Sequence, residues 1–226
     1  MRLLDILDRI ISGLDFPLDV LSYSGASLSV KNVKFASKGR FVTIMGTDYQ
    51  IKAVDYDNNV IELTEPVPIG TTTASIPTPF FFHGTAQMQN EEWTSKNFDS
   101  DKFPCIYLRE VVNSTEYPKS SGNIHESEND VTLYLINSVN FEEWTTDDHY
   151  KNVLLPLEYV LNALKNALEN DKEVGKIEQY SRINRVNLGV FSTDKGNTQA
   201  FFTDRVSAIE LGFNLPIKRG CKCINC

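Results

Sequence analysis

The sequence predicts an α+β fold, in which a long amphipathic helix packs on an antiparallel sheet and a small β-barrel sub-domain is inserted ahead of them. Residues 145–170 place apolar side chains at helical spacing over about five turns. Residues 130–138 and 209–217 flank this segment and have the β-branched, aromatic or alternating composition of strands. Residues 27–85 contain short strand-like runs between turn signals, which is typical of a small barrel or sandwich.

The chain has 226 residues, which is enough for one large domain or two small ones. The patterns divide it into an α+β domain, an inserted barrel with a core of its own, and a Cys-containing tail. We expect these parts at residues 1–26 and 86–218 for the α+β domain, 27–85 for the insert and 219–226 for the tail.

The long helix has clear start signals and one discordant residue. Thr145 or Thr146 can cap its first turn, and Asp147 and Asp148 suit the positive end of the helix dipole. Pro156 lies inside the apolar stripe, where a proline removes a backbone hydrogen bond and clashes with the preceding turn. Two outcomes remain open: the helix kinks at Pro156, or a short first turn ends and the main helix begins with Pro156 in its first turn.

The insert is expected to consist of short strands, because turn residues interrupt its apolar runs at close spacing. If it has a separate core, a charge at Ile51 or Val54 should damage the barrel and leave the α+β core largely folded. The expected strands are Leu28–Phe35, Phe41–Met45, Tyr49–Asp55, Val60–Leu63 and Ala74–His83.

The α+β domain is expected to begin with a short helix at residues 2–13, which either packs on its own chain or docks on a neighbouring subunit. The run from Phe103 to Val112 predicts a strand. After the long helix, residues 183–191 are expected to pair with residues 200–217 as a hairpin.

Two polar segments, Gly84–Lys102 and Asn113–Asn129, have almost nothing to bury and are expected to be long loops. Such segments can order against a neighbouring subunit, with Trp93 as the large aromatic anchor. Removing Trp93 or residues 115–127 should therefore leave a folded monomer that no longer assembles.

Composition and charge exclude several classes of protein. With 41% hydrophobic and 23% charged residues, the composition is that of an ordinary globular protein. The formal net charge of −8 is unfavourable for gripping nucleic acid, although it suits a passage through which DNA slides without sticking. No run approaches the length that spans a bilayer, and charged residues near the start interrupt any signal-peptide core. We therefore expect folding in the cytoplasm and no membrane partner.

The titratable residues form no catalytic pattern. His125 and His149 stand beside acidic residues, but we expect His125 in a hydrophilic loop and His149 in the first turn of the helix, both at the solvated surface. No Gly-rich phosphate loop, zinc-protease motif or nucleophile elbow occurs. We therefore predict no catalytic residue, no bound cofactor and no enzyme activity, and an enzyme with an unrecognised site is kept as the third hypothesis.

The four cysteines do not suggest a disulfide framework. Cys105 is expected in a strand, and Cys221, Cys223 and Cys226 crowd the end of the chain. Three thiolates can bind Zn²⁺ or Cu⁺, with Cys105 as a possible fourth ligand. Structural zinc sites usually combine two separated pairs of ligands, however, so we predict that the tail carries no obligatory metal.

Several stretches between residues 85 and 217 carry a family resemblance: a short helix leads to a strand, a loop, a second strand, a capped long helix and a closing hairpin. This order and these stretches resemble the tail-terminator and neck proteins of tailed bacteriophages, especially connector ring proteins of phages infecting Bacteroides-type hosts, including crAss-like phages. The insert at 27–85 departs from the minimal terminator plan. The stretches are Gly84-Thr85, Lys102–Leu108, Tyr150–Leu168 with Leu155-Pro156-Leu157, and Thr203–Ile209.

The resemblance implies a virion structural protein made in the host cytoplasm. It would form a homo-oligomeric ring at the head–tail junction, contact portal, tail and other neck proteins, and leave an axial passage for DNA. Its expected subunit interface includes Trp93, Phe80, Phe81, Phe82 and His125, although the Phe80–Phe82 run also suits a core strand. The alternative, from another class, is a β-barrel binding module that recognises an assembly or host protein through Phe80–Phe82 and Trp93.

Overall fold

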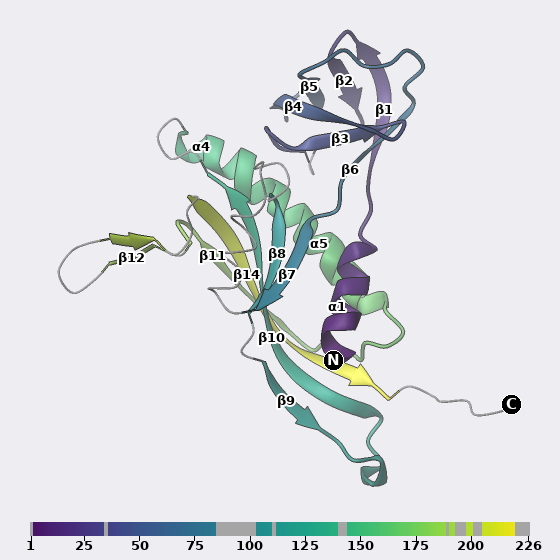
Figure 1. Cartoon of the computed structure of the whole chain (residues 1–226), viewed down its shortest axis with the longest axis vertical. Helices are drawn as coiled ribbons and strands as arrows, with labels where there is room; N and C mark the ends of the chain where they lie inside the picture. Colours follow the sequence, from purple (N-terminus) through teal and green to yellow (C-terminus); the bar gives the residue numbers. More distant parts are fainter. Residues whose placement is uncertain are drawn as a thin grey trace, which may run out of the picture.

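The computed structural model describes residues 2–33, 36–84, 103–109, 112–139, 144–188, 190–192, 198–200 and 205–219. The protein is mainly β, with one long helix of 25 residues and a closed six-stranded antiparallel barrel. Figure 1 shows the barrel at one end of the molecule, the main sheet with its long helix in the middle, and an extended ribbon at the other end.

The barrel closes in the order β1-β2-β5-β4-β3-β6, so each of its strands has a partner on both sides. Alternate residues point inward, as in β2, β3 and β5, where every second side chain is buried. The strands are β1 (Phe16–Ser24), β2 (Ser27–Val30), β3 (Phe41–Ile44), β4 (Thr47–Asp55), β5 (Val60–Leu63) and β6 (Thr73–Ile76).

The barrel differs from the predicted insert at both ends. Its first strand, β1, lies before the predicted start at Ser27, and it supplies the partner of both β2 and β6. The predicted strand Ala74–His83 is two strands: β6 closes the barrel, whereas β7 (Phe80–Gly84) joins the main sheet. Pro77 and Pro79 separate them, because proline cannot donate to a ladder of backbone hydrogen bonds.

The main sheet has the order β11-β14-β10-β8-β7, with β9 paired to the first half of β10. It is antiparallel, as predicted, except that β7 and β8 run parallel to each other. The strands are β8 (Cys105–Arg109), β9 (Asn113–Glu116), β10 (His125–Ser138), β11 (Tyr180–Arg185) and β14 (Val206–Lys218).

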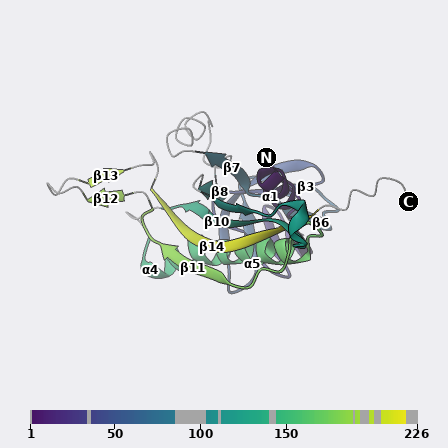
Figure 2. The ribbon, with the colours of Figure 1, turned by 90° about the horizontal axis from the view of Figure 1, so that it is seen from below.

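The long helix packs on one face of this sheet, as Figure 2 shows. It consists of α4 (Thr146–His149), the π-helical segment η2 (Tyr150–Leu154) and α5 (Leu155–Asn170). Thr145 is the N-cap, and its side chain and that of Asp148 form a reciprocal capping box, which confirms the predicted start. Pro156 lies in the first turn of α5, which is the second of the two predicted outcomes.

Asn137 of β10 compensates for the proline in this helix. Pro156 cannot donate the amide hydrogen bond that the carbonyl of Asn152 receives in a regular α-helix. Asn137 is 4% exposed, and its Nδ2 donates to that carbonyl at 3.2 Å. The sheet therefore supplies a donor at the place where the helix lacks one.

We expect Asn137→Ala to lower the free energy of unfolding by about 1–3 kcal/mol, because it removes a buried donor from the Asn152 carbonyl. In a Pro156→Ala background the backbone regains its own N–H, so the same substitution should cost less. Denaturant unfolding of the four chains in this double-mutant cycle measures the difference. Equal costs in both backgrounds would disconnect Asn137 from the proline.

Residues 113–129 are not the predicted loop. Asn113–Glu116 form β9, and this strand pairs with residues 127–130 of β10, which in turn pair with β14. We call β9, residues 125–130 of β10 and residues 214–218 of β14 the ribbon. The polar sequence of β9 shows no alternation of apolar residues, because all four of its residues are exposed. Deleting 115–127 would therefore remove paired strands rather than a free loop.

The segment after the long helix forms two pairings instead of one hairpin. β11 pairs with residues 208–213 of β14, whereas β12 (Val190–Ser192) and β13 (Thr198–Ala200) form a separate two-stranded sheet. The turn after β11 includes Asn187 in the left-handed region, at φ +59°. We call β12 and β13 the projecting hairpin, because both views show it standing away from the body (Figures 1 and 2).

Helix α1 (Arg2–Ser12) lies between the barrel and the ribbon and buries Ile6, Leu7, Ile10 and Ile11. The buried side chains of the barrel, α1 and the helix side of the main sheet form one contiguous cluster, so side chains touch across the junction. Nevertheless, no described strand pairs both with a barrel strand and with a strand of the main sheet. The two parts thus share side-chain contacts without sharing a sheet.

Candidate functional site

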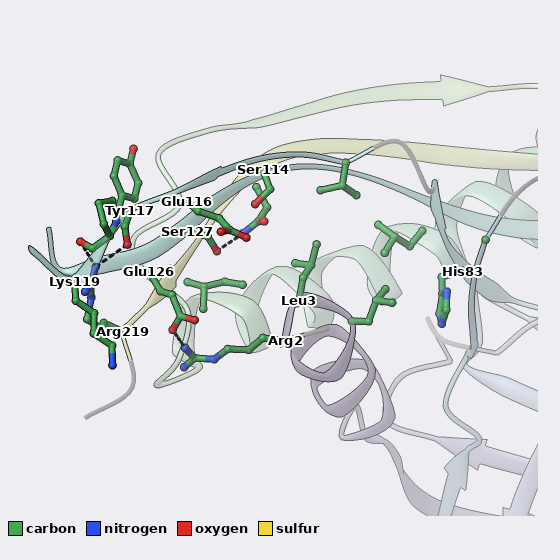
Figure 3. Close-up of a pocket in the computed structure, with 17 residues that line it drawn as sticks. Arg2, Leu3, His83, Ser114, Glu116, Tyr117, Lys119, Glu126, Ser127 and Arg219 are labelled. Atoms are coloured by element: carbon green, nitrogen blue, oxygen red, sulfur yellow. Dashed lines mark hydrogen bonds and ion pairs between the residues drawn. The ribbon is translucent and has the colours of Figure 1, made fainter. Parts of the chain in front are cut away.

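A groove runs along the ribbon, between its helix-side face and the first turn of α1 (Figure 3). Its volume is about 1210 Å³. Small-molecule sites usually enclose about 300–1,000 Å³, so this groove is larger than a typical small-molecule pocket. The lining residues are Arg2, Leu3, Leu4, His83, Gly84, Leu108, Val112, Ser114, Glu116, Tyr117, Pro118, Lys119, Glu126, Ser127, Asn129, Ile217 and Arg219.

The floor of the groove is polar and firmly paired. Ser114 and Glu116 of β9 lie opposite Asn129 and Ser127 of β10, so these four side chains share one face. Asn129 is 3% exposed, and its Nδ2 donates to Ser127 Oγ and to the backbone oxygen of Leu215, both at 3.1 Å. These bonds tie the side chains of the floor to both long strands.

Ion pairs hold α1 as the wall of the groove. Arg2 pairs with Glu126 of the ribbon and with Glu173, whose Oε1 is 3.3 Å from Nη2. Arg9 contacts Asp171 at 2.6 Å and Glu173 at 2.7 Å, just beyond the end of α5. The hydrogen bond from Arg9 lowers the pKa of the Asp171 carboxyl, whose side chain is 9% exposed. Arg2 thus fixes the first turn of α1 to the ribbon, and Arg9 fixes its last turn to the segment that follows the long helix.

Arg219 closes the far end of the groove. Its Nη2 donates to the backbone oxygens of Tyr117, Pro118 and His125 at 3.0, 3.2 and 3.3 Å. Nearby, Lys119 and Glu116 line the groove and form no ion pair within the described residues. This end therefore offers one charge of each sign to a partner.

No protein-family model, curated protein or solved structure matches this chain. Its function is therefore inferred from its own residues and geometry. Within the described ranges, no three His, Cys, Asp or Glu side chains are grouped to hold a metal ion. No helix in the same ranges is long and apolar enough to cross a membrane.

The predicted interface residues lie in different places. Phe82 is 4% exposed and stacks on Tyr107, with ring centroids 5.0 Å apart, so it is a core residue of β7 on the face opposite the long helix. Phe80 and Phe81 are half-buried on opposite faces of the same strand.

Trp93, the predicted anchor, lies outside the described residues. The groove residues near α1 were not predicted, because they come together only through the ribbon.

His125 is not in the solvated loop that its neighbours suggested. It begins β10, its side chain is 21% exposed, and its Nδ1 lies 3.4 Å from Glu128 Oε1. A Cβ on Gly175 would come within 2.9 Å of His125 Nε2, so the ring packs closely against that glycine. His125 therefore helps to hold residue 175 against the ribbon.

Cys105 is in β8, as predicted, and is fully buried. Its Sγ lies 4.0 Å from the backbone oxygen of Ile136. Residues Cys221, Cys223 and Cys226 lie outside the described residues, so the metal prediction for the tail stays a prediction.

His149 makes a contact that the sequence did not indicate. Its Nε2 lies 3.1 Å from Oγ of Ser207, a β14 residue with 0% exposure. The backbone N–H of Asn187 donates to the same Oγ at 3.3 Å, which leaves the hydroxyl proton free to donate to a neutral imidazole. Although Ser and His resemble a nucleophile and its base, a buried hydroxyl cannot meet a substrate, and the pair fastens α4 to β14.

We expect His149 to make stability pH-dependent. Burial lowers the pKa of His149 below its ordinary value of about 6.5, so the unfolded chain binds more protons between the two pKa values. The contribution of neutral His149 to the free energy of unfolding is therefore complete above about pH 6.5 and is lost as the pH falls below that value. Chemical unfolding of wild type and His149→Gln from pH 5 to 8 gives the difference between their free energies of unfolding. His83 and His125 are present in both proteins, so their contributions cancel in this difference. A difference that does not change with pH would contradict the assignment.

Proposed function

We propose that this chain is a virion structural protein, a subunit of an oligomeric ring in the head–tail connector of a tailed bacteriophage. The order of elements supports the proposal: α1, β8, β10, the long helix, and then β11 and β14 follow one another as the resemblance requires. The barrel interrupts this order between α1 and β7 as an added part. On this proposal portal, tail and other neck proteins are its neighbours.

The observation that carries the proposal is that the subunit has two different sides. One side presents β11, which pairs with β14 on one edge and has five exposed residues of six, together with the projecting hairpin. The other side presents α1 and the groove. A closed ring is built from head-to-tail contacts between unlike surfaces, and this subunit offers such a pair.

The charge distribution supports passage of DNA without specific binding. The net charge is −8, and several of the described arginines are paired with carboxylates. Arg182 lies 2.6 Å from Glu158, and Arg185 lies 2.7 Å from Glu210. A protein that grips DNA needs free basic groups to replace the counterions of the phosphates, and paired arginines do not serve this purpose.

The expected result for the purified chain is a ring, formed either alone or on the portal protein of the same phage. Its mass should be a whole-number multiple of 25.6 kDa, and particles should show rotational symmetry on electron-microscope grids. Mass photometry and negative-stain imaging measure both properties. A chain that stays a monomer with portal present would refute the proposal.

One observation favours the alternative of a barrel that binds another protein. Leu21, Met45 and Ile69 are 68%, 75% and 93% exposed. All three lie at the barrel end remote from α1. Strands β1 and β3 run away from α1, and Leu21 and Met45 lie late in or just after them, whereas β6 runs back toward α1 and Ile69 precedes it. Exposed apolar side chains at one end of a domain are typical of a contact site. A stable one-to-one complex without ring formation would support this alternative.

A further inference from the structure

The projecting hairpin and the groove lie on opposite sides of the subunit. Figures 1 and 2 both place the hairpin on one side of the main sheet and α1, which walls the groove, on the other. β14 joins the two regions, since it starts shortly after β13 and ends at the groove with Ile217. At about 3.3 Å per residue, its 13 residues separate the two features by about 40 Å.

Among the described strands, the projecting hairpin pairs with no other part of its own subunit. β12 and β13 form a separate sheet, and each has its principal contacts with the other. A two-stranded hairpin alone in water is at best marginally stable, because it has no third strand or helix to cover a face.

Among the described residues, no helix or strand covers the groove. Among the described strands, β9 pairs only with β10, so its outer edge presents free backbone donors and acceptors. Leu3 and Leu4 of α1 and Val112 before β9 are only partly buried and add apolar surface to the groove. An extended segment from another chain can pair with the β9 edge while its side chains cover these residues.

We infer that the projecting hairpin of one copy inserts into the groove of the next copy and pairs with the free edge of β9. This inference rests on the proposed ring, whose head-to-tail contact it specifies. The hairpin and the groove are unlike surfaces on opposite sides of one subunit, so the contact repeats from copy to copy and closes into a ring. In this contact β9 becomes the third strand of the hairpin, and the hairpin covers the groove.

A disulfide between copies tests this contact. In a full-length chain with Cys221, Cys223 and Cys226 replaced by Ser, one sample carries Ser114→Cys and a second carries Thr198→Cys. The expected result is a covalent dimer in the oxidised mixture and none in either sample alone. An assembled mixture without the cross-link would overturn the inference, and so would cross-linking of a single sample, which indicates contact between like surfaces.

A matched pair of substitutions gives an independent test. Ser114 and Thr115 are neighbouring exposed residues of β9, but only Ser114 lines the groove. Ser114→Trp should weaken the contact between subunits about tenfold or more, the equivalent of about 1.4 kcal/mol, and so lower the fraction of chain in rings. Thr115→Trp should leave assembly unchanged, and circular dichroism confirms that both variants fold. Equal assembly of the two folded variants would overturn the inference.

These experiments separate the inference from the proposed function. If wild type forms rings and Ser114→Trp also does, the ring stands and the contact lies elsewhere. If wild type forms no ring even on the portal, the proposed function fails, and the inference fails with it.

Discussion

Ile51→Asp should unfold the barrel and leave the main sheet folded. Ile51 is 1% exposed and lies on the inner face of β4, so the substitution places a carboxylate inside the barrel. Burying an unpaired carboxylate costs several kcal/mol, whether it stays charged or takes up a proton. All six barrel strands pair within the barrel, so their loss breaks no backbone hydrogen bond of the main sheet.

Hydrogen exchange followed by mass spectrometry measures this result for each region. The amides of β2 to β5 should lose protection, while those of β10, β14 and α5 should keep it. Val54, on the same strand, is only half-buried, so Val54→Asp should cost less than Ile51→Asp. Loss of protection in both regions together would show that the contiguous side-chain cluster makes them one cooperative unit.

Leu164→Ala should have the reciprocal effect. Leu164 is 0% exposed on the face of α5 that covers the main sheet. Removing a buried leucine side chain typically costs about 2–5 kcal/mol, since apolar contacts are lost and a cavity remains. The helix and the main sheet should therefore open more readily, while the barrel keeps its own protection.

The control is Asn162→Ala, two residues earlier on the exposed side of the same helix. It changes no buried contact, so its effect on stability should be within about 0.5 kcal/mol. Thermal unfolding gives the total loss, and hydrogen exchange assigns it to a region. A loss for Leu164→Ala no larger than for the control would mean that the helix contributes little to the core.

The elements whose side chains alternate between core and solvent could be predicted from the sequence. The long helix, its Thr145 cap, and the alternating run Ile209–Ile217 were all predictable, because burial of one face imposes a period of 3.6 or 2 on apolar residues. The same applies to Val60–Leu63 in the barrel. The strand β1 was missed although Phe16, Leu18 and Val20 alternate in the same way.

The ribbon, the place of β7 and the groove depend on contacts between segments that are distant in the chain. β9 is polar on both faces, so its strand geometry comes from backbone pairing with β10 and leaves no pattern in the side chains. β7 continues the apolar run of β6, but two prolines direct it into another sheet. The groove unites α1 with the ends of β10 and β14, which are far apart in the chain. Its residues are recognisable only after folding, because a concave surface is a property of packing between distant segments.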